Sequence, residues 1–193
     1  MAALFSFFFF MAFFIVIALA LYGVAIYNAL INVKNNIKKA WGNIDVLLKQ
    51  RHDEIPKLIK TCESYMQYEK DTLEKVVKLR QEAIDASDVN NKSAKEGQLS
   101  QALSSVFALA ENYPELKSQE LFSQLHTRIS ELESSISGRR EFYNESVNAY
   151  NIRIESFPDQ IVANFMNLTQ EEMFKVAESE KIDPGINISQ PTG

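Results

Sequence analysis

The residue types that most often perform catalysis or bind metals are few and scattered in this chain. There are two histidines, His52 and His126, and one cysteine, Cys62. Neither histidine has a second ligand at a metal-binding spacing such as HExxH, so the sequence predicts no metal site and no cofactor. Cys62 lies on an apolar stripe, which favours a buried, inert thiol over a nucleophile. A single cysteine also excludes an intrachain disulfide.

The patterns that bind phosphate or nucleic acid are missing as well. The six glycines are scattered singly, and the net charge of −5 comes without a basic domain, which argues against nucleic acid as a partner. We therefore expect a non-catalytic protein. A catalytic site would have to be assembled from Asp45, Arg51 and Glu69.

Three charged residues, Arg51, Glu69 and Arg80, occupy positions where a helical pattern calls for apolar side chains. A buried charge needs a partner. One interpretation puts them at the edge of the apolar seam with only their stems buried. The other makes them, with Asp45, an interhelical polar network that fixes register. For Arg51 the expected partner is Glu69 of a neighbouring chain or a carboxylate on the last long helix.

Asparagines extend this predicted structural network. Asn28, Asn144 and Asn151 each follow a tyrosine. Asn144 and Asn151 are seven residues apart, so they share a helix face beside the seam. An asparagine at a helical seam lowers stability but specifies register. The alternative is a polar patch that binds a partner.

The element that must carry these residues begins with an apolar run over 4–26, and the first charged side chain in the chain is Lys34. At 1.5 Å per residue a helix of this length spans about 34 Å, enough to cross the ~30 Å core of a bilayer. We predict a transmembrane helix. A cleaved signal peptide is the alternative, since Ala18-Leu19-Ala20 fits a cleavage site. However, no positive region precedes the run, and the run continues past Ala20.

Charge after this run predicts orientation. Residues 34–80 carry 11 Lys or Arg against 7 Asp or Glu, whereas 81–193 carry 9 against 18. Lys34, Lys38 and Lys39 lie just beyond the membrane exit, where we expect contact with lipid headgroups. By the positive-inside rule the N-terminus lies outside and the C-terminal domain in the cytoplasm.

In the rest of the chain apolar residues recur at spacings of three and four, and no strand pattern occurs. The resulting apolar stripes include Leu58, Val76, Leu99, Val106 and Ile129. We expect one long helix over 30–84, kinked or broken near Pro56, then a loop over 85–92. A second helix starts at a capping box of Ser93 and Glu96. A third helix covers 117–156, followed by a short apolar segment and a second capping box of Thr169 and Glu172. The predicted fold is all-α: an anchor over 1–27 that continues into an antiparallel up-and-down helical bundle over 28–178, and a disordered tail over 179–193.

Two blocks of sequence carry a family resemblance. The first contains Tyr27-Asn28-Ala29-Leu30, Ala40-Trp41, the run NIDVLLKQR over 43–51, Asp53-Glu54-Ile55-Pro56, Tyr65, Glu69, Leu73, Val76 and Arg80. The second contains Tyr113-Pro114-Glu115-Leu116-Lys117, Arg139-Arg140-Glu141-Phe142-Tyr143-Asn144, Val147, Tyr150-Asn151 and Phe157-Pro158. In this order and spacing they resemble the LemA family of bacterial membrane proteins. His52 and the residues past 168 depart from the family pattern.

The resemblance implies a single-pass inner-membrane protein with its helical domain in the cytoplasm. Family members occur beside membrane proteases and in magnetosome-forming bacteria, which implies work in the envelope or in organising membranes. We expect a membrane-tethered scaffold that binds membrane lipid, further copies of itself, or a membrane protein such as a protease. The alternative is a sensory or ligand-binding bundle. The homo-oligomer is expected to form through the membrane-proximal part of the long helix, whose apolar stripe the second and third helices would leave uncovered. The alternative is that segment 161–178 folds back and covers this stripe.

Overall fold

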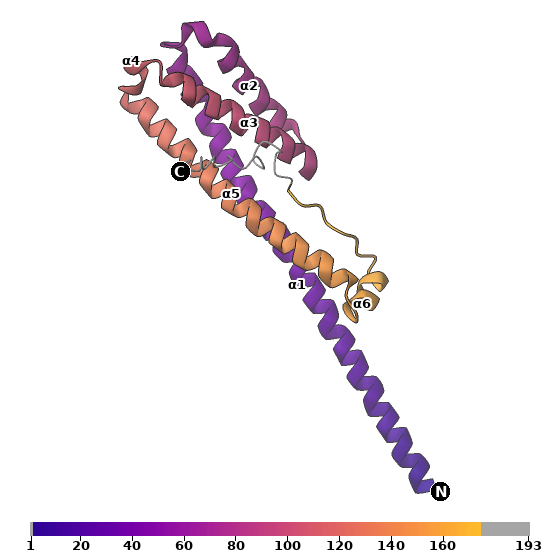
Figure 1. Cartoon of the computed structure of the whole chain (residues 1–193). Coiled ribbons are helices and arrows are strands. Elements are labelled where there is room, and N and C mark those ends of the chain that lie inside the picture. Colours follow the sequence, from indigo (N-terminus) through magenta and orange to yellow (C-terminus); the bar gives the residue numbers. More distant parts are fainter. Residues whose placement is uncertain (1, 175–193) are drawn as a thin grey trace, which may run out of the picture. The chain divides into compact units, whose positions relative to one another are not determined.

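The structure, a computed structural model, describes residues 2–174, and every regular element in that range is helical (Figure 1). The elements are α1 (Ala2–Glu63), a 3₁₀ turn η1 (Gln67–Glu69), α2 (Lys70–Asp85), α3 (Val89–Ala110), α4 (Pro114–Lys117), α5 (Glu120–Glu155) and α6 (Asp159–Phe165). The predicted all-α class and the long N-terminal helix are confirmed. The predicted tail over 179–193 lies outside the described residues.

The chain divides into two compact units. Unit 1 comprises Met1–Asn43 and Glu141–Glu172, and unit 2 comprises Ile44–Arg140 together with the chain from Met173 onward. Both α1 and α5 contribute to each unit. Within each unit a cluster of polar side chains joins segments that are far apart in the sequence, and the two clusters differ in chemistry.

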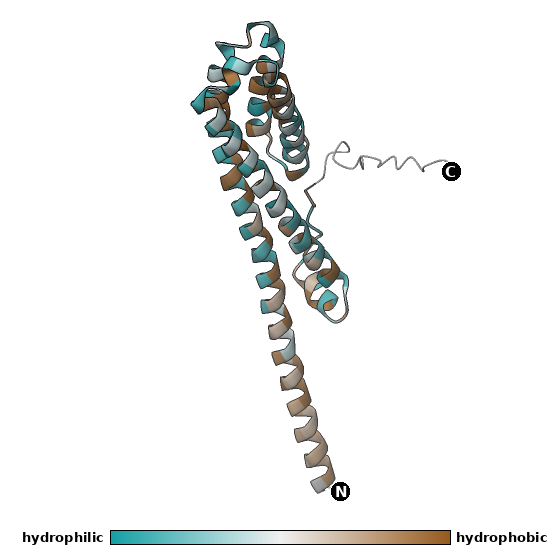
Figure 2. Ribbon diagram, turned by 60° about the vertical axis from the view of Figure 1, so that its left-hand side comes forward, coloured by the Kyte–Doolittle hydropathy of each residue, from teal (hydrophilic) through white to brown (hydrophobic). Residues whose placement is uncertain are grey.

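In unit 1, α1 changes character along its length (Figure 2). The residues over 4–25 are exposed, apart from the half-buried Gly23, and nearly all of them are apolar. From Ile26 onward one face is buried, as is the facing stripe of α5; the buried residues are Ile26, Leu30, Ile37, Ala40, Tyr143, Val147, Tyr150 and Ile154. Among the described residues, α1 is the one helix apolar enough to span a membrane.

In unit 2 the core is formed by the last part of α1, by α2, α3 and α4, and by the start of α5. Its centre contains Leu58, Val76, Leu99, Val106 and Ile129, each completely buried. Helices α2 and α3 pack along each other, joined by a link of three residues (Figure 1). These positions belong to the apolar stripes read from the sequence, so the 3.6-residue periodicity identified the core face correctly.

The prediction of one helix over 30–84 with a kink or break near Pro56 is wrong about where the chain breaks. Helix α1 continues through Pro56 and ends at Glu63. The carbonyl of Cys62 there accepts from the backbone N–H groups of Tyr65 and Met66, at 3.0 and 2.8 Å. Met66 is 1% exposed, so the chain turns here with this side chain in the core, and no glycine or proline marks the end of the helix.

Both predicted capping boxes are also wrong. Helix α3 begins at Val89, and its cap is Asp88, whose side chain accepts from the Asn91 N–H at 2.7 Å. Ser93 and Glu96 lie inside the helix and are buried. Thr169 and Glu172 lie in a stretch without helix, because the backbone there bonds to side chains of α5 instead.

Candidate functional site

The most deeply buried polar site in the described residues surrounds Arg51 of α1. Its side chain is completely buried and donates to Glu96 of α3 and to Glu133 of α5. It also donates to Ser100 Oγ at 2.8 Å. Three helices of unit 2 therefore meet on one guanidinium. The interhelical interpretation holds for Arg51, and the expected carboxylate on the last long helix is Glu133.

His52 and Ser100 complete this cluster, which we call the Arg51 cluster (Arg51, His52, Glu96, Ser100 and Glu133). His52 Nε2 lies 3.2 and 3.3 Å from the two carboxylate oxygens of Glu96. Ser100 Oγ donates to Glu133 at 2.9 Å. Glu133, with its side chain 30% exposed, forms the solvent-facing edge of the cluster.

Electrostatics keep Glu96 ionised. Burial alone raises the pKa of this carboxyl, but the hydrogen bond from His52 and the charge of Arg51 outweigh it, so the pKa lies below its ordinary value. A carboxylate held in this way is a structural counter-ion. It is poorly suited to proton transfer near neutral pH, which needs a carboxyl pKa raised toward 7.

The other predicted network residues of unit 2 have separate partners. Asp45 pairs with Lys92 at 2.9 Å, and Glu69 accepts from the Tyr113 hydroxyl at 3.5 Å. Arg80 Nε donates to the backbone carbonyl of His52 at 2.7 Å. Asp45, Arg51 and Glu69, the three residues from which a catalytic site would have to be assembled, are thus not brought together.

That bond from Arg80 explains how α1 continues through a proline. Pro56 has no backbone N–H, so the carbonyl of His52, four residues earlier, loses its helical partner. Arg80 of α2 supplies the missing donor. Arg80 therefore occupies a position where an apolar residue is expected because its side chain bonds to a backbone carbonyl of α1.

In unit 1 Tyr143, Tyr150 and Asn151 of α5 bind a segment of the same chain, residues 168–172, which we call the strap. Asn151 Nδ2 donates to the carbonyl of Glu171 at 3.0 Å, and its Oδ1 accepts from the Glu171 N–H at 2.9 Å. The hydroxyl of Tyr150 donates to the Thr169 carbonyl at 3.1 Å, and that of Tyr143 to the Glu172 carbonyl at 2.9 Å.

Burial, and secondarily the charge of Glu171, raises the pKa of both tyrosines of the strap site, Tyr143 and Tyr150, so they keep their protons and remain donors. Asn144 is half-buried beside them, whereas Asn28 is exposed on α1. Of the three lysines predicted to contact lipid headgroups, Lys34 pairs with Glu171 of the strap at 3.6 Å, while Lys38 and Lys39 are exposed.

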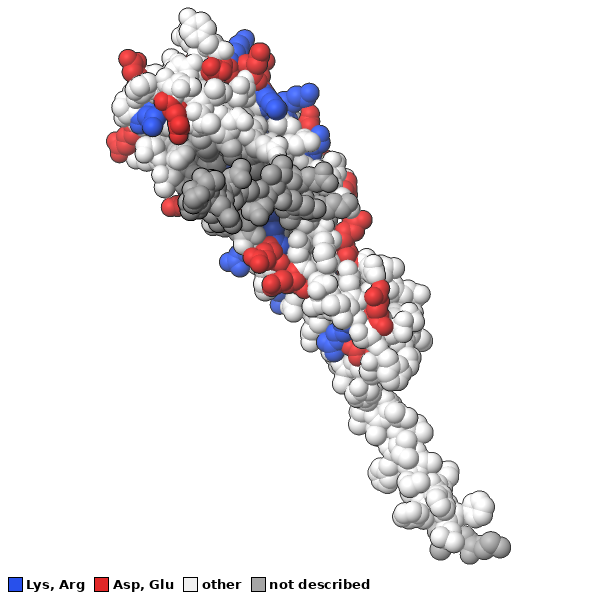
Figure 3. Space-filling model, in the orientation of Figure 1, with Lys and Arg blue, Asp and Glu red and all other residues white. Residues whose placement is uncertain are grey.

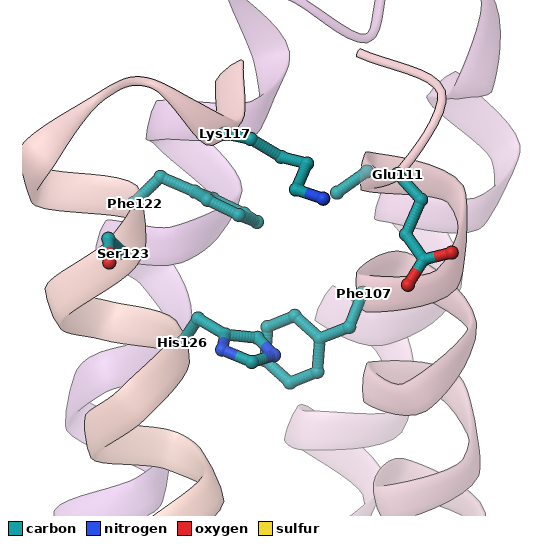
Figure 4. Close-up of a pocket in the computed structure, with 7 residues that line it drawn as sticks. Phe107, Glu111, Lys117, Phe122, Ser123 and His126 are labelled. Carbon is teal, nitrogen blue, oxygen red and sulfur yellow. The ribbon is translucent and has the colours of Figure 1, made fainter. Parts of the chain in front are cut away.

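A surface pocket of about 210 Å³ lies in unit 2, where α3, α4 and α5 meet (Figure 4). His126 packs edge-to-face on Phe107, with ring centroids 4.4 Å apart, and Phe122 lies beyond it. Glu111 and Lys117 line the pocket from opposite sides, and the Lys117 side chain extends across the space between the helices. Sequence analysis assigned no role to His126, because an isolated histidine on a helix carries no ligand or catalytic signal.

Cys62 behaves as the sequence predicted. Its side chain is completely buried in the core of unit 2, and burial raises the pKa of the thiol to about 11. A thiol with such a pKa forms little thiolate at neutral pH and is a poor nucleophile.

Sequence reasoning missed Glu96 and Ser100. Glu96 lies three residues before Leu99, on the same apolar stripe as Leu103 and Val106. It therefore occupies a position expected to be apolar, which is the same signal that singled out Arg51. The match of Ser93 and Glu96 to a capping box hid that signal.

The fold and these sites define a class: a helical, membrane-associated protein with one apolar N-terminal helix and buried polar contacts between its helices. A sequence model of the LemA family matches residues 40–188, and the chain belongs to this family. It is 29% identical to the protein LemA of Metamycoplasma hominis over 180 residues, which is 91% of this chain and 82% of that protein.

Shorter similarities reach magnetosome proteins. The chain is 31% identical over 80 residues to a magnetosome protein MamQ of Paramagnetospirillum magneticum, which covers 42% of this chain and 29% of that protein. The MamQ of Magnetospirillum gryphiswaldense is 28% identical over 79 residues, with 41% and 29% covered.

Proposed function

We propose that this chain is a non-catalytic scaffold of the bacterial inner membrane, anchored by α1. The observation that carries the proposal is the exposed apolar stretch over 4–25 that continues, within one helix, into the helical domain. On the face shown in Figure 3 this end of the molecule carries no charged side chain. An exposed apolar surface of this length is costly in water and stable in a bilayer.

In this proposal the N-terminus lies outside and the helical domain lies in the cytoplasm. The support is charge: the exposed Lys38 and Lys39 follow the apolar stretch, whereas residues 1–33 contain no charged side chain. A C-terminal fusion to alkaline phosphatase, which is active only outside the cytoplasm, should be inactive, whereas a fusion to green fluorescent protein should fluoresce. Strong phosphatase activity would contradict this orientation.

Charge reversal sharpens the topology test. Lys38→Glu combined with Lys39→Glu should raise phosphatase activity, because it removes exposed positive charge beside the membrane exit. The matched control is Lys75→Glu with Lys78→Glu on α2, two exposed lysines far along the chain from the apolar stretch. Equal activity from the two pairs would show that these lysines do not orient the protein.

The scaffold role is supported by the way the charged groups of unit 2 are used. Arg51 bonds to both Glu96 and Glu133 and so joins three helices; these charges stabilise the arrangement of the helices that a binding surface needs. Crosslinking in native membranes, followed by identification of the captured proteins, tests this role. We expect membrane proteins, a protease among them, or further copies of the chain. Turnover of a small molecule by the purified full chain would contradict the proposal.

The proposal includes self-association of the chain in the membrane, but an uncovered apolar stripe does not support it. The stripe expected to be uncovered is buried within unit 1, as Ile26, Leu30 and Ile37 show. The remaining support is the anchor, which confines copies to two dimensions and raises their effective concentration. Cysteines at the exposed Asn32, Asn35 or Asn36 in a Cys62→Ala background should form interchain crosslinks in membranes. Absence of crosslinks, with a monomer by light scattering, would refute self-association.

A second candidate function, ligand binding, is favoured by the pocket at His126. Its volume of about 210 Å³ is below the roughly 300–1,000 Å³ usual for ligand sites, so it suits a small zwitterion held between Glu111 and Lys117. The chain has only two histidines, and His52 is buried elsewhere in unit 2. Titrating the full chain with single amino acids should therefore shift the NMR signals of His126 and leave those of His52 in place. Unchanged His126 signals across all twenty amino acids would exclude this candidate.

A further inference from the structure

The last helix of unit 1 presents a row of large apolar side chains to the outside. Phe157, just before α6, and Ile161 and Phe165 within it are 82%, 63% and 88% exposed. They are spaced four residues apart, and Ile161 and Phe165 share a face of the helix. On the other side of α6, Ala163 is 1% exposed, so the helix has one face against the protein and one face outward. We call Phe157, Ile161 and Phe165 the α6 face.

The α6 face is also free of uncompensated charge. No charged residue occurs from 160 to 169. Asp159, at the start of α6, pairs with Arg153 of α5 at 2.5 Å, and its side chain is 14% exposed. An isolated charge would oppose transfer into an apolar medium, and this pairing removes that obstacle.

The position of α6 within unit 1 indicates what covers the face. Helix α6 lies beside α1 near the place where α1 changes from exposed to buried (Figures 1 and 2). The change occurs at Ile26, directly after the apolar stretch, and the flanking Tyr22 and Tyr27 are exposed. Tyrosines at the end of an apolar span mark the membrane interface. The α6 face therefore lies beside the membrane exit of α1.

We propose that the α6 face inserts into the interface of the lipid bilayer and forms a second membrane contact beside α1. This inference rests on the proposed anchor, since it requires the bilayer to surround residues 4–25. Apolar faces of surface-bound helices sink about 5–10 Å into the boundary between headgroups and acyl chains. Aromatic side chains such as Phe157 and Phe165 suit that depth. Unit 1 is then fixed to the membrane at two points.

The test uses the full chain reconstituted in vesicles of phosphatidylcholine and phosphatidylglycerol. A single cysteine replaces Ile161 or Phe165 in a Cys62→Ala background and carries an environment-sensitive fluorophore. We expect a blue shift of the emission, quenching by nitroxide-labelled lipid, and loss of quenching by aqueous iodide. Phe14→Cys within the apolar stretch serves as the lipid-exposed reference. Tyr68→Cys in unit 2, where the native side chain is 95% exposed, serves as the water-exposed reference.

Three results would overturn the proposal, and they are distinguishable. If the α6 positions behave like the Tyr68 position while the Phe14 position is quenched by lipid, the anchor is correct and the α6 face lies in water. If the Phe14 position is also accessible to iodide, the anchor itself is wrong. If protection from iodide at α6 disappears when protein is diluted at constant lipid, a second copy of the chain covers the face instead of the bilayer.

Discussion

The two units position their segments with different kinds of polar contact. In unit 2 the Arg51 cluster joins three helices through ionised side chains that are buried or half-buried. In unit 1 the strap is held by Tyr143, Tyr150 and Asn151, which are neutral and bond to backbone groups. Both sets join residues far apart in the sequence. The Arg51 cluster relies on buried charge, whereas the strap relies on neutral bonds to its backbone, and its ion pair between Lys34 and Glu171, at 3.6 Å, is partly exposed.

The difference has an energetic consequence. Removing one member of a buried ion pair leaves an uncompensated charge and costs about 3–5 kcal/mol, whereas removing one partner of a neutral hydrogen bond costs less, about 1–3 kcal/mol. The interior of unit 2 should therefore open only with global unfolding. The strap, by contrast, is held by contacts that can be lost one at a time, and it should detach locally.

The largest effect should come from Arg51→Ala, which leaves the completely buried Glu96 without its guanidinium partner. We expect the free energy of unfolding to fall by about 3–5 kcal/mol, measured by urea denaturation of the detergent-solubilised full chain. The matched control on the same helix is Lys57→Ala, which breaks an exposed pair with Glu54 and should cost less than about 1 kcal/mol. A loss below about 0.5 kcal/mol for Arg51→Ala would contradict a buried, paired Arg51.

Acid should destabilise the protein by a smaller amount through Glu96. Its pKa is lower in the folded than in the unfolded chain, so its contribution to stability is fully present above the unfolded value of about 4.3 and is lost as pH falls through the folded pKa. The effect is smaller than that of Arg51→Ala, because protonation neutralises Glu96 and leaves Arg51 bonded to Glu133.

The measurement is the urea midpoint between pH 7 and pH 3. Glu96→Gln should flatten this dependence, since glutamine does not titrate. Glu141→Gln, at an exposed position of α5, should leave the dependence as in the parent protein. Identical pH profiles for Glu96→Gln and the parent would show that Glu96 does not contribute to acid sensitivity.

The smallest effect should come from the strap. Asn151→Ala removes one donor and one acceptor from the backbone of Glu171, which should cost about 1–2 kcal/mol locally. We expect faster hydrogen exchange of the amides over 168–172, with the global unfolding midpoint almost unchanged. Asn148→Ala, on the exposed side of α5, is the control. If exchange over 168–172 does not change, Asn151 does not hold the strap.

Periodicity predicted the parts of the fold that depend on burial. The apolar stretch of α1, the core stripes and the buried Cys62 follow from the spacing of apolar residues, whereas for Arg51 the spacing left open whether the side chain lies at the edge of the seam or in a buried network. The break after Glu63 was missed, because the stripe keeps its phase there and no glycine or proline marks it. Pro56 is a strong local signal for a break, but a side chain from α2 overrides it.

The polar partners were harder to predict than the buried positions. The Arg51–Glu96 contact joins residues 45 apart, and the Arg51–Glu133 contact joins residues 82 apart, so the pairing depends on tertiary packing. The strap was missed for a related reason. Thr169 and Glu172 satisfy a local helix signal, yet the backbone between them finds donors and acceptors on α5.

The bond between Arg80 and the carbonyl left without a partner by Pro56 also resolves an ambiguity. Apolar stripes on two helices fit almost equally well after one helix slides past the other by a turn, because similar side chains recur every three or four residues. An unpaired carbonyl inside a helix occurs at a single position, and one guanidinium can reach it in only one alignment. Pro56 thus marks the one position on α1 where Arg80 of α2 can bond to a free carbonyl. A missing hydrogen bond within one helix thereby defines how the two helices align along their axes.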